Sequence, residues 1–209
     1  MYFVYDIGEY MAVFSFALPL LMVFLRPWLW KYCWPIFLLI VFKFLSVGLE
    51  LVFARVFKNC YPIFHISVFI ETFLILLYFI HSGFYRKISL FFLATAVILF
   101  YIETFYLEQL FNNNFMMTLF SNVVISLISF LNLFTLFSSK KLDKSYFQFH
   151  FFINTGFFIF YVSSFYVSLF ESYIRESISL FIIIYPIFWI FLITENILLT
   201  KGIWHLQKI

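Results

Sequence analysis

A single acidic residue stands near the middle of an apolar run that is long enough to cross a membrane. The run is FHISVFIETFLILLYFI, which begins at Phe64, and the acidic residue is Glu71. Placing a carboxylate at the centre of a bilayer costs roughly 2.5–3.5 kcal/mol on insertion scales. A residue kept at that cost is expected to carry a proton, to hold an ion pair or to bind a ligand.

A lysine in the preceding apolar run is the natural partner for this carboxylate. Lys43 lies about nine residues into residues 35–54, at a depth similar to that expected for Glu71. A Lys43–Glu71 pair would offset the burial of both charges and would hold the two segments together. The alternative is a Glu71 that is protonated and carries no charge.

Polar residues recur at helical spacing in four of the apolar runs, so each set lies on one helical face. Because lipid offers no hydrogen-bond partner, these faces should turn toward the protein interior. Such residues either join helices by hydrogen bonds or line a binding site. The four sets are Lys43, Ser46 and Glu50; Ser67, Glu71 and Tyr78; Asn122, Ser126 and Ser129; and Asn154, Tyr161 and Ser168.

A second group of titratable residues is expected toward the outer end of the spans. Glu50, His65 and Glu103 each lie about three or four residues from that end. Carboxylates and an imidazole at one depth can form a proton site, a metal site or a binding pocket, or can reach the headgroup layer. Together with Glu71 and Asn154, they make up the candidate binding pocket.

The remaining titratable groups of the spans and their inner ends support no metal or catalytic assignment. His81, His150 and His205 fall on the other side, and their spacing matches no helix pair. Glu195 is expected near the inner surface, in contact with headgroups or Lys201. No metal, cofactor or catalytic residue is assigned, because neither a nucleophile–base pair nor three clustered metal ligands are evident.

The elements that must position these residues are membrane-spanning helices. Of 209 residues, 65% are hydrophobic and 11% are charged, whereas soluble domains are about 45–50% apolar and about 25% charged. The fold class predicted is all-α, a polytopic bundle that forms one seven-helix transmembrane domain over residues 1–209. The seven apolar runs lie at about residues 9–25, 35–54, 62–80, 88–107, 116–138, 147–170 and 177–199.

The distribution of basic residues predicts the orientation of the bundle. An N-terminus outside and a C-terminus in the cytoplasm place nine Lys and Arg residues inside and three outside, in agreement with the positive-inside rule. The formal net charge of +3 is too small and too scattered for a nucleic-acid partner. The inside residues are Arg26, Lys31, Arg86, Lys87, Lys140, Lys141, Lys144, Lys201 and Lys208, and the outside residues are Arg55, Lys58 and Arg175.

Three segments carry a resemblance to a known family: FHISVFIETF (64–73), FFINTGFFIFYVSSFYVSLF (151–170) and ENILLTKGIW (195–204). They resemble a family of small, uncharacterised seven-span membrane proteins common in Bacteroidota. In that family a His or Tyr followed six residues later by Glu marks the third span, which corresponds here to His65 and Glu71. The resemblance implies a seven-helix protein of a bacterial inner membrane, sometimes associated with signalling proteins.

Three functions remain open on this basis. The first is a non-enzymatic sensor or signalling module that binds a ligand in the outer polar pocket and acts through a membrane or signalling partner. The second is a proton-coupled carrier or a membrane-embedded lipid enzyme that uses Glu71 as proton carrier or general acid/base. The third is a scaffold subunit of a larger membrane complex. The sequence leaves the ligand and the oligomeric state open.

Overall fold

The protein is an all-α bundle, as the sequence predicts. The computed structural model describes residues 10–58, 61–83, 85–105, 115–139, 143–170, 173–174 and 177–206, and these residues contain no strand. Six helices are long and apolar enough to cross a membrane, so the chain is a multi-pass membrane protein. The helices are α2 (Ala17–Leu25), α3 (Leu29–Val56), α4 (Tyr61–Ser82), α5 (Arg86–Phe105), α6 (Phe115–Ser138), α7 (Lys144–Leu169) and α9 (Ile178–His205).

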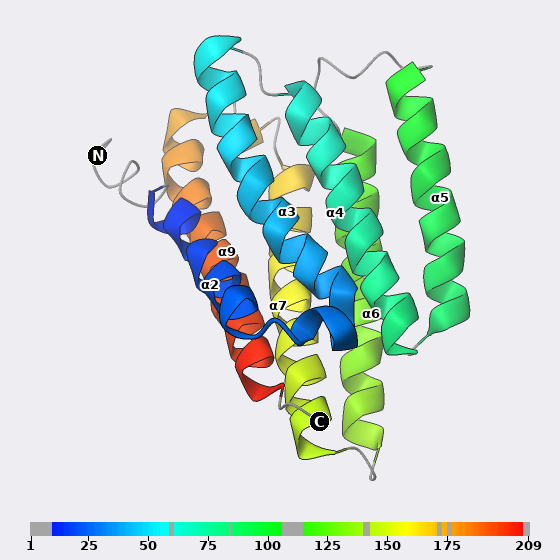
Figure 1. Ribbon diagram of the computed structural model, residues 1–209. Coiled ribbons are helices and arrows are strands. Elements are labelled where there is room, and N and C mark those ends of the chain that lie inside the picture. The colour runs from blue at the N-terminus through cyan, green and yellow to red at the C-terminus, as the bar shows by residue number, and fades with distance from the viewer. Residues whose placement is uncertain are drawn as a thin grey trace.

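The long helices run up and down through one layered bundle (Figure 1). Helix α7 packs against α6 and α9, and α4 packs against α3, α5 and α6. Helix α5 lies at the edge of the bundle, and α2 lies across α3 and α9. Segments from both halves of the chain therefore surround the interior into which the polar faces point.

The N-terminal helix is shorter than the other helices of the bundle. The helical stretch Tyr10–Leu25 has a turn at Phe16 and falls below the length of the six long helices. At 1.5 Å per residue it covers about 24 Å, less than the roughly 30 Å of a hydrocarbon core. The predicted run at 9–25 is thus a helix, but one too short to count among the six.

Two helix ends differ from the predicted spans for local reasons. Helix α3 begins at Leu29 and contains a break at Cys33 (φ −151°, ψ 64°), two residues before Pro35. Proline lacks the amide proton of a continuing helix and disfavours helical backbone before it. Helix α9 continues to His205 instead of ending near residue 199. Six more residues add about 9 Å and place Glu195 deeper than the sequence prediction does.

Most of the predicted polar faces do turn inward. Thr72 Oγ1 lies 2.6 Å from Ser121 Oγ, which joins α4 to α6, and Asn122 donates to Ser168 Oγ over 3.2 Å, which joins α6 to α7. Ser126 differs, because its hydroxyl donates to a carbonyl of its own helix. Polar residues of the interior therefore connect neighbouring helices across the bundle.

Glycine allows α7 and α9 to approach each other closely. A Cβ atom at Gly202 would lie 3.0 Å from Ile153 Cδ1 and 3.2 Å from the Phe149 carbonyl oxygen. A Cβ atom at Gly156 would lie 3.4 Å from the Glu195 carbonyl oxygen. Small residues at such crossings let the backbones meet and increase van der Waals contact.

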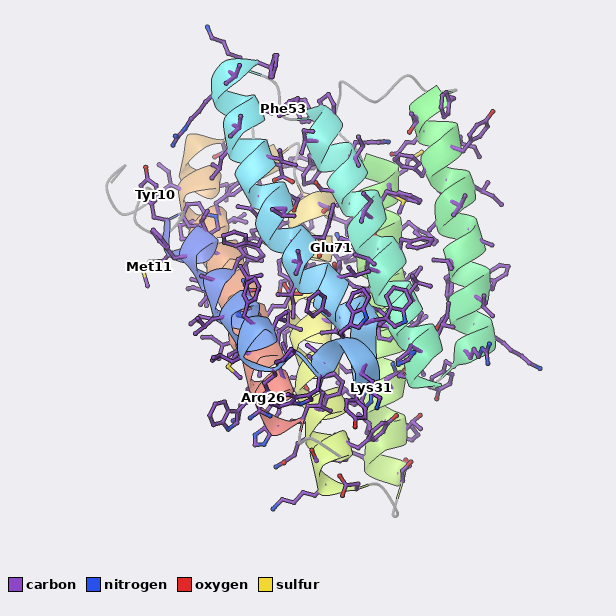
Figure 2. The ribbon with its side chains drawn as sticks, viewed as in Figure 1. Tyr10, Met11, Arg26, Lys31, Phe53 and Glu71 are labelled. Atoms are coloured by element: carbon purple, nitrogen blue, oxygen red, sulfur yellow. The ribbon has the colours of Figure 1, made fainter. Side chains whose placement is uncertain are left out.

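The end of the bundle that carries the C-terminus is held by polar contacts between distant segments. Arg26 donates to the Leu206 carbonyl over 2.5 Å, and its guanidinium lies 5.1 Å from the Trp204 ring. Figure 2 shows Arg26 and Lys31 at this end. Of the basic residues used to predict orientation, Lys140, Lys141, Arg175 and Lys208 lie outside the described residues.

Candidate functional site

A buried ammonium group is shared by two carboxylates at the centre of the bundle. Lys43 Nζ lies 2.8 Å from Glu71 Oε1 and 2.7 Å from Glu195 Oε1. The side chains of Lys43 and Glu195 are 5% and 0% exposed, while Glu71 keeps 22% exposure. The three residues come from α3, α4 and α9, so one lysine connects three helices.

Helix α7 completes this charged cluster. Tyr161 donates its hydroxyl hydrogen to Glu71 Oε1 over 2.5 Å. The ring of Phe160, the preceding residue, lies 5.2 Å from Lys43 Nζ. Figure 2 places Glu71 near mid-height in the bundle, behind α3. The contact expected between Lys43 and Glu71 is therefore present, and it belongs to a larger group.

The expectation that Glu195 contacts headgroups or Lys201 is wrong. Its side chain is fully buried, and Oε1 accepts a hydrogen bond from Lys43. Glu195 Oε2 is also buried, and it has no hydrogen-bond partner among the described residues. The error follows from the predicted end of the last span, because the extension of α9 to His205 moves Glu195 away from the surface.

A polar cavity of about 240 Å³ lies beside the charged cluster. Glu50, Ser46, Lys43, Ser67 and Glu71 supply its polar side chains, from α3 and α4. The cavity thus takes up the polar faces that the sequence predicts for these two helices. Its other walls are Ala12, Val13, Phe16, Val47, Phe64, Val68, Phe160, Phe188, Trp189 and Leu192.

Glu50 faces Glu71 across this cavity without a cation of its own. Its half-buried side chain accepts a hydrogen bond from the Ser67 hydroxyl. In the described residues, ion pairs within 4 Å are formed by Lys43 alone, with Glu71 and Glu195. The cavity wall therefore carries more acidic than basic groups.

The other titratable residues of the candidate pocket lie at helix contacts elsewhere. His65 Nε2 is 2.9 Å from Thr104 Oγ1, and its ring stacks near Phe100 on α5. Glu103 Oε1 accepts from the backbone amides of Met116 and Met117, over 3.0 and 3.2 Å. Glu103 thereby satisfies two amide groups at the start of α6. Neither His65 nor Glu103 lines the cavity.

Asn154 belongs to a separate hydrogen-bond network. It donates to Tyr78 Oη over 3.1 Å and accepts from Asn132 Nδ2 over 3.1 Å. Tyr78 Oη lies 2.7 Å from His150 Nδ1. The ring of Phe157 packs between Tyr78 and Tyr161, so this network is not joined to the charged cluster by hydrogen bonds. Across the described ranges, no group of three or more His, Cys, Asp and Glu side chains could hold a metal ion.

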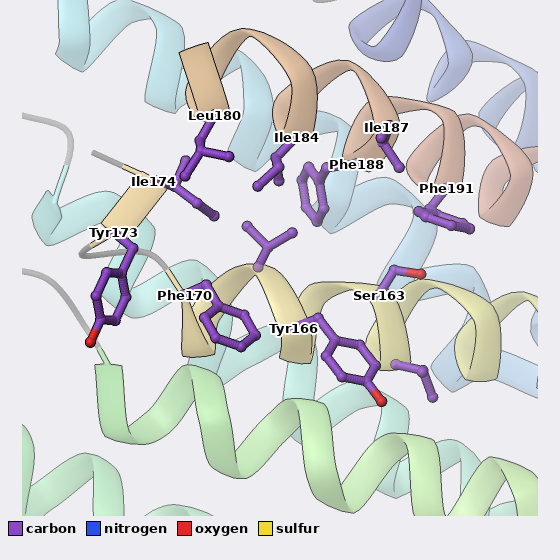
Figure 3. Close-up of a pocket in the computed structure, with 12 residues that line it drawn as sticks. Ser163, Tyr166, Phe170, Tyr173, Ile174, Leu180, Ile184, Ile187, Phe188 and Phe191 are labelled. Carbon is purple, nitrogen blue, oxygen red and sulfur yellow. The ribbon is translucent and has the colours of Figure 1, made fainter. Parts of the chain in front are cut away.

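A larger, apolar cavity of about 610 Å³ lies between α7 and α9 (Figure 3). Phe170, Ile184 and Phe191 are among the aromatic and aliphatic side chains on its walls, and Ser163 and Tyr166 add hydroxyl groups. Phe188 contributes to both cavities. Sequence reasoning missed this space, because apolar residues that line a cavity have the same pattern as residues that face lipid.

The polar cavity and the cluster beside it can bind a charged or hydrogen-bonding molecule, or can exchange a proton. They combine one ammonium, three carboxylates, a phenol and two hydroxyl groups. The sequence identified Lys43, Glu50 and Glu71 through their helical spacing. It also placed Tyr161 on the polar face of its helix, but nothing in the spacing shows that Tyr161 and Glu195 meet the same group.

No family model matches the chain, and neither a curated protein nor a solved structure matches it. The resemblance to the Bacteroidota family therefore stays a prediction. The function is inferred below from the geometry of the cavity and of the charged cluster.

Proposed function

We propose that the protein is a non-enzymatic sensor module of a bacterial inner membrane, which binds a small ligand in the polar cavity and acts through a partner protein. The observation that carries this proposal is the cavity of about 240 Å³ that Lys43, Glu50 and Glu71 line. Ligand pockets combine apolar walls with a few convergent polar groups, and this cavity has that composition.

The charged cluster offers a means of converting ligand binding into helix movement. Lys43 holds Glu71 and Glu195 at the same time, so α3, α4 and α9 meet at one ammonium group. A ligand that binds Glu71 competes with Lys43 and Tyr161 for the same carboxylate. Because a ligand shifts a conformational equilibrium only through differential contacts, this competition is the contact that would favour another helix arrangement.

The proposed orientation places the cavity in the outer half of the membrane. Glu50 and Ser67 lie toward the bundle end at which α3 ends and α4 begins. The positive-inside rule assigns that end to the outside, with the N-terminus outside and the C-terminus cytoplasmic as in a seven-span protein. The segments between successive helices are short, and a separate protein at the cytoplasmic face or in the bilayer is proposed to receive the signal.

The partner is tested by affinity purification of the tagged protein from host membranes in mild detergent, read by mass spectrometry. A stoichiometric partner with a soluble output domain is expected, and Glu50→Gln and Glu71→Gln should each change its output. Asp143→Asn is the matched control, because Asp143 caps α7 far from the cavity. Recovery of the protein alone, or output that neither Glu variant changes, would contradict the sensor proposal.

A proton-coupled carrier is the second candidate, and the shared lysine favours it. A carboxylate that exchanges between an ammonium and a proton is a plausible carrier group in a membrane. This function predicts that the purified protein alone moves protons in proteoliposomes with a pH-sensitive dye inside. Glu71→Gln should abolish that flux. Flux equal to that of protein-free liposomes would exclude the carrier.

A further inference from the structure

We infer that the polar cavity binds a small organic ammonium group attached to an aromatic or aliphatic body. This inference rests on the proposed ligand-binding function and adds the chemical class of the ligand. It follows from the charge, the wall composition and the size of the cavity.

The charge of the site favours a cation. Glu50, Glu71 and Glu195 supply three carboxylates against one ammonium, that of Lys43. A buried charge is stable only when it is paired or hydrogen-bonded, and within the described residues Glu50 has only the Ser67 hydroxyl. A ligand ammonium between Glu50 and Glu71 would bring a second cation to a site that lacks one.

An unpartnered buried oxygen in the same cluster gives a second, independent reason. Glu195 Oε2 is fully buried and has no donor in the described part of the chain. Each carboxylate oxygen accepts hydrogen bonds, and a buried acceptor without a donor is costly. If a ligand ammonium takes over Glu71, the Lys43 ammonium is free to serve both oxygens of Glu195.

The walls and the volume select the body of the ligand. Five aromatic side chains line the cavity, and an ammonium group is attracted to aromatic faces within about 6 Å. The volume of about 240 Å³ lies below the usual range of about 300–1,000 Å³ for ligand pockets. The cavity therefore fits one ring or a short chain next to the ammonium. The five side chains are Phe16, Phe64, Phe160, Phe188 and Trp189.

The test uses three probes of similar size and different charge: benzylammonium, benzyl alcohol and benzoate. The full-length protein is placed in phosphatidylglycerol nanodiscs, whose headgroups contain no ammonium, and binding is measured by calorimetry against protein-free nanodiscs. Benzylammonium should bind at least tenfold more tightly than benzyl alcohol, and benzoate should not bind. Glu50→Gln should weaken benzylammonium binding at least tenfold, and Asp143→Asn should leave it unchanged.

Two results would overturn the inference, and they separate it from the proposed function. If benzyl alcohol or benzoate binds as tightly as benzylammonium and Ser67→Phe abolishes the binding, the cavity is a ligand site but the ammonium assignment is wrong. If none of the probes binds, both the assignment and the ligand-binding cavity fail. Because the probe comparison uses the unmodified chain, this conclusion does not depend on the folding of a variant.

A further arm identifies the source of the ammonium. Half of the phosphatidylglycerol is replaced by phosphatidylethanolamine, whose headgroup ends in an ammonium. A weaker apparent affinity for benzylammonium would show that the lipid headgroup occupies the cavity. An unchanged affinity would show that the cavity takes a free amine. Both results support recognition of an ammonium group.

Discussion

Lys43 is the residue on which the buried charges of this protein depend. Its ammonium lies within 2.8 Å of two carboxylates, one of them fully buried. Removing one partner of a buried ion pair leaves an uncompensated charge, and this costs more than the net energy of the pair. Stability should therefore respond to the balance of charges in the cluster as well as to the number of its contacts.

Lys43→Met should lower the free energy of unfolding by roughly 3–5 kcal/mol, because Glu71 and Glu195 would keep their burial and lose their cation. The triple variant that also carries Glu71→Gln and Glu195→Gln should recover most of this loss. Unfolding by denaturant in detergent micelles measures both values. Lys87→Met, at an exposed lysine, is the control and should stay within about 0.5 kcal/mol of the wild type. A single Lys43→Met variant as stable as the control would contradict the charge balance.

Sequence spacing predicted part of this cluster, and the missing part has a physical reason. Lys43 and Glu71 lie at similar depth in successive apolar runs, so their contact follows from the spacing. Glu195 comes from the last helix, more than a hundred residues away along the chain. Its place depends on the packing of α9 against α7 and α2, which hydrophobic periodicity does not encode. His65 and Glu103 have the spacing of pocket residues but contact α5 and α6.

At the scale of helices, side-chain acceptors and small residues decide how the elements start and pack. Glu103 satisfies two amides at the start of α6, and Gly202 permits close contact between α9 and α7. Apolar periodicity predicted the six long helices to within a few residues at most ends. It misplaced the end of α9 and the start of α3, where the helix continues as an irregular turn before Pro35.

Glu103→Ala should destabilise the protein by about 1–3 kcal/mol, because two buried amides at the start of α6 would lose their acceptor. Glu103→Gln should cost less, since an amide oxygen still accepts hydrogen bonds. Thermal unfolding of the two variants in detergent compares them directly. Equal losses in both variants would show that the charge of Glu103, and not its acceptor oxygen, is what the fold needs.

Gly202→Leu should destabilise the contact between α7 and α9 by about 1–3 kcal/mol or more, because the new side chain would meet Ile153 and the Phe149 carbonyl. Gly48→Leu is the matched control in a helix, since nothing lies within 4 Å of a Cβ atom there. The control should keep or raise stability, because leucine favours helix over glycine by nearly 1 kcal/mol. Similar stability of the two variants would contradict close packing at Gly202.

At the scale of the whole molecule, the distribution of basic residues and the place of the cavity combine into one topology. The bundle has six long helices and the shorter helix Tyr10–Leu25. The proposed orientation puts the cavity toward the outside and the Arg26 end in the cytoplasm. The sequence predicts this orientation from its charges, and the helix arrangement alone does not decide it, because a bundle has the same internal contacts in both orientations.

Single-cysteine labelling tests the orientation. Lys58→Cys and Lys87→Cys are introduced separately after Cys33 and Cys60 have been replaced by serine. Lys58 lies exposed between α3 and α4, and Lys87 lies exposed in the first turn of α5, at the opposite end. A membrane-impermeant maleimide should label the first variant in intact cells and the second only after permeabilisation. The reverse pattern would place the cavity on the cytoplasmic side.

The most direct test of the central claim is native mass spectrometry of the protein released from nanodiscs made of host membrane. The wild type is expected to carry a bound small molecule. Ser67→Phe should abolish this mass, because Ser67 lines the cavity and the new ring would fill it. Ile66→Phe, at the neighbouring outward-facing residue that is 42% exposed, should retain it. A wild type without bound mass, or a bound mass that Ser67→Phe leaves unchanged, would contradict a ligand site in the polar cavity.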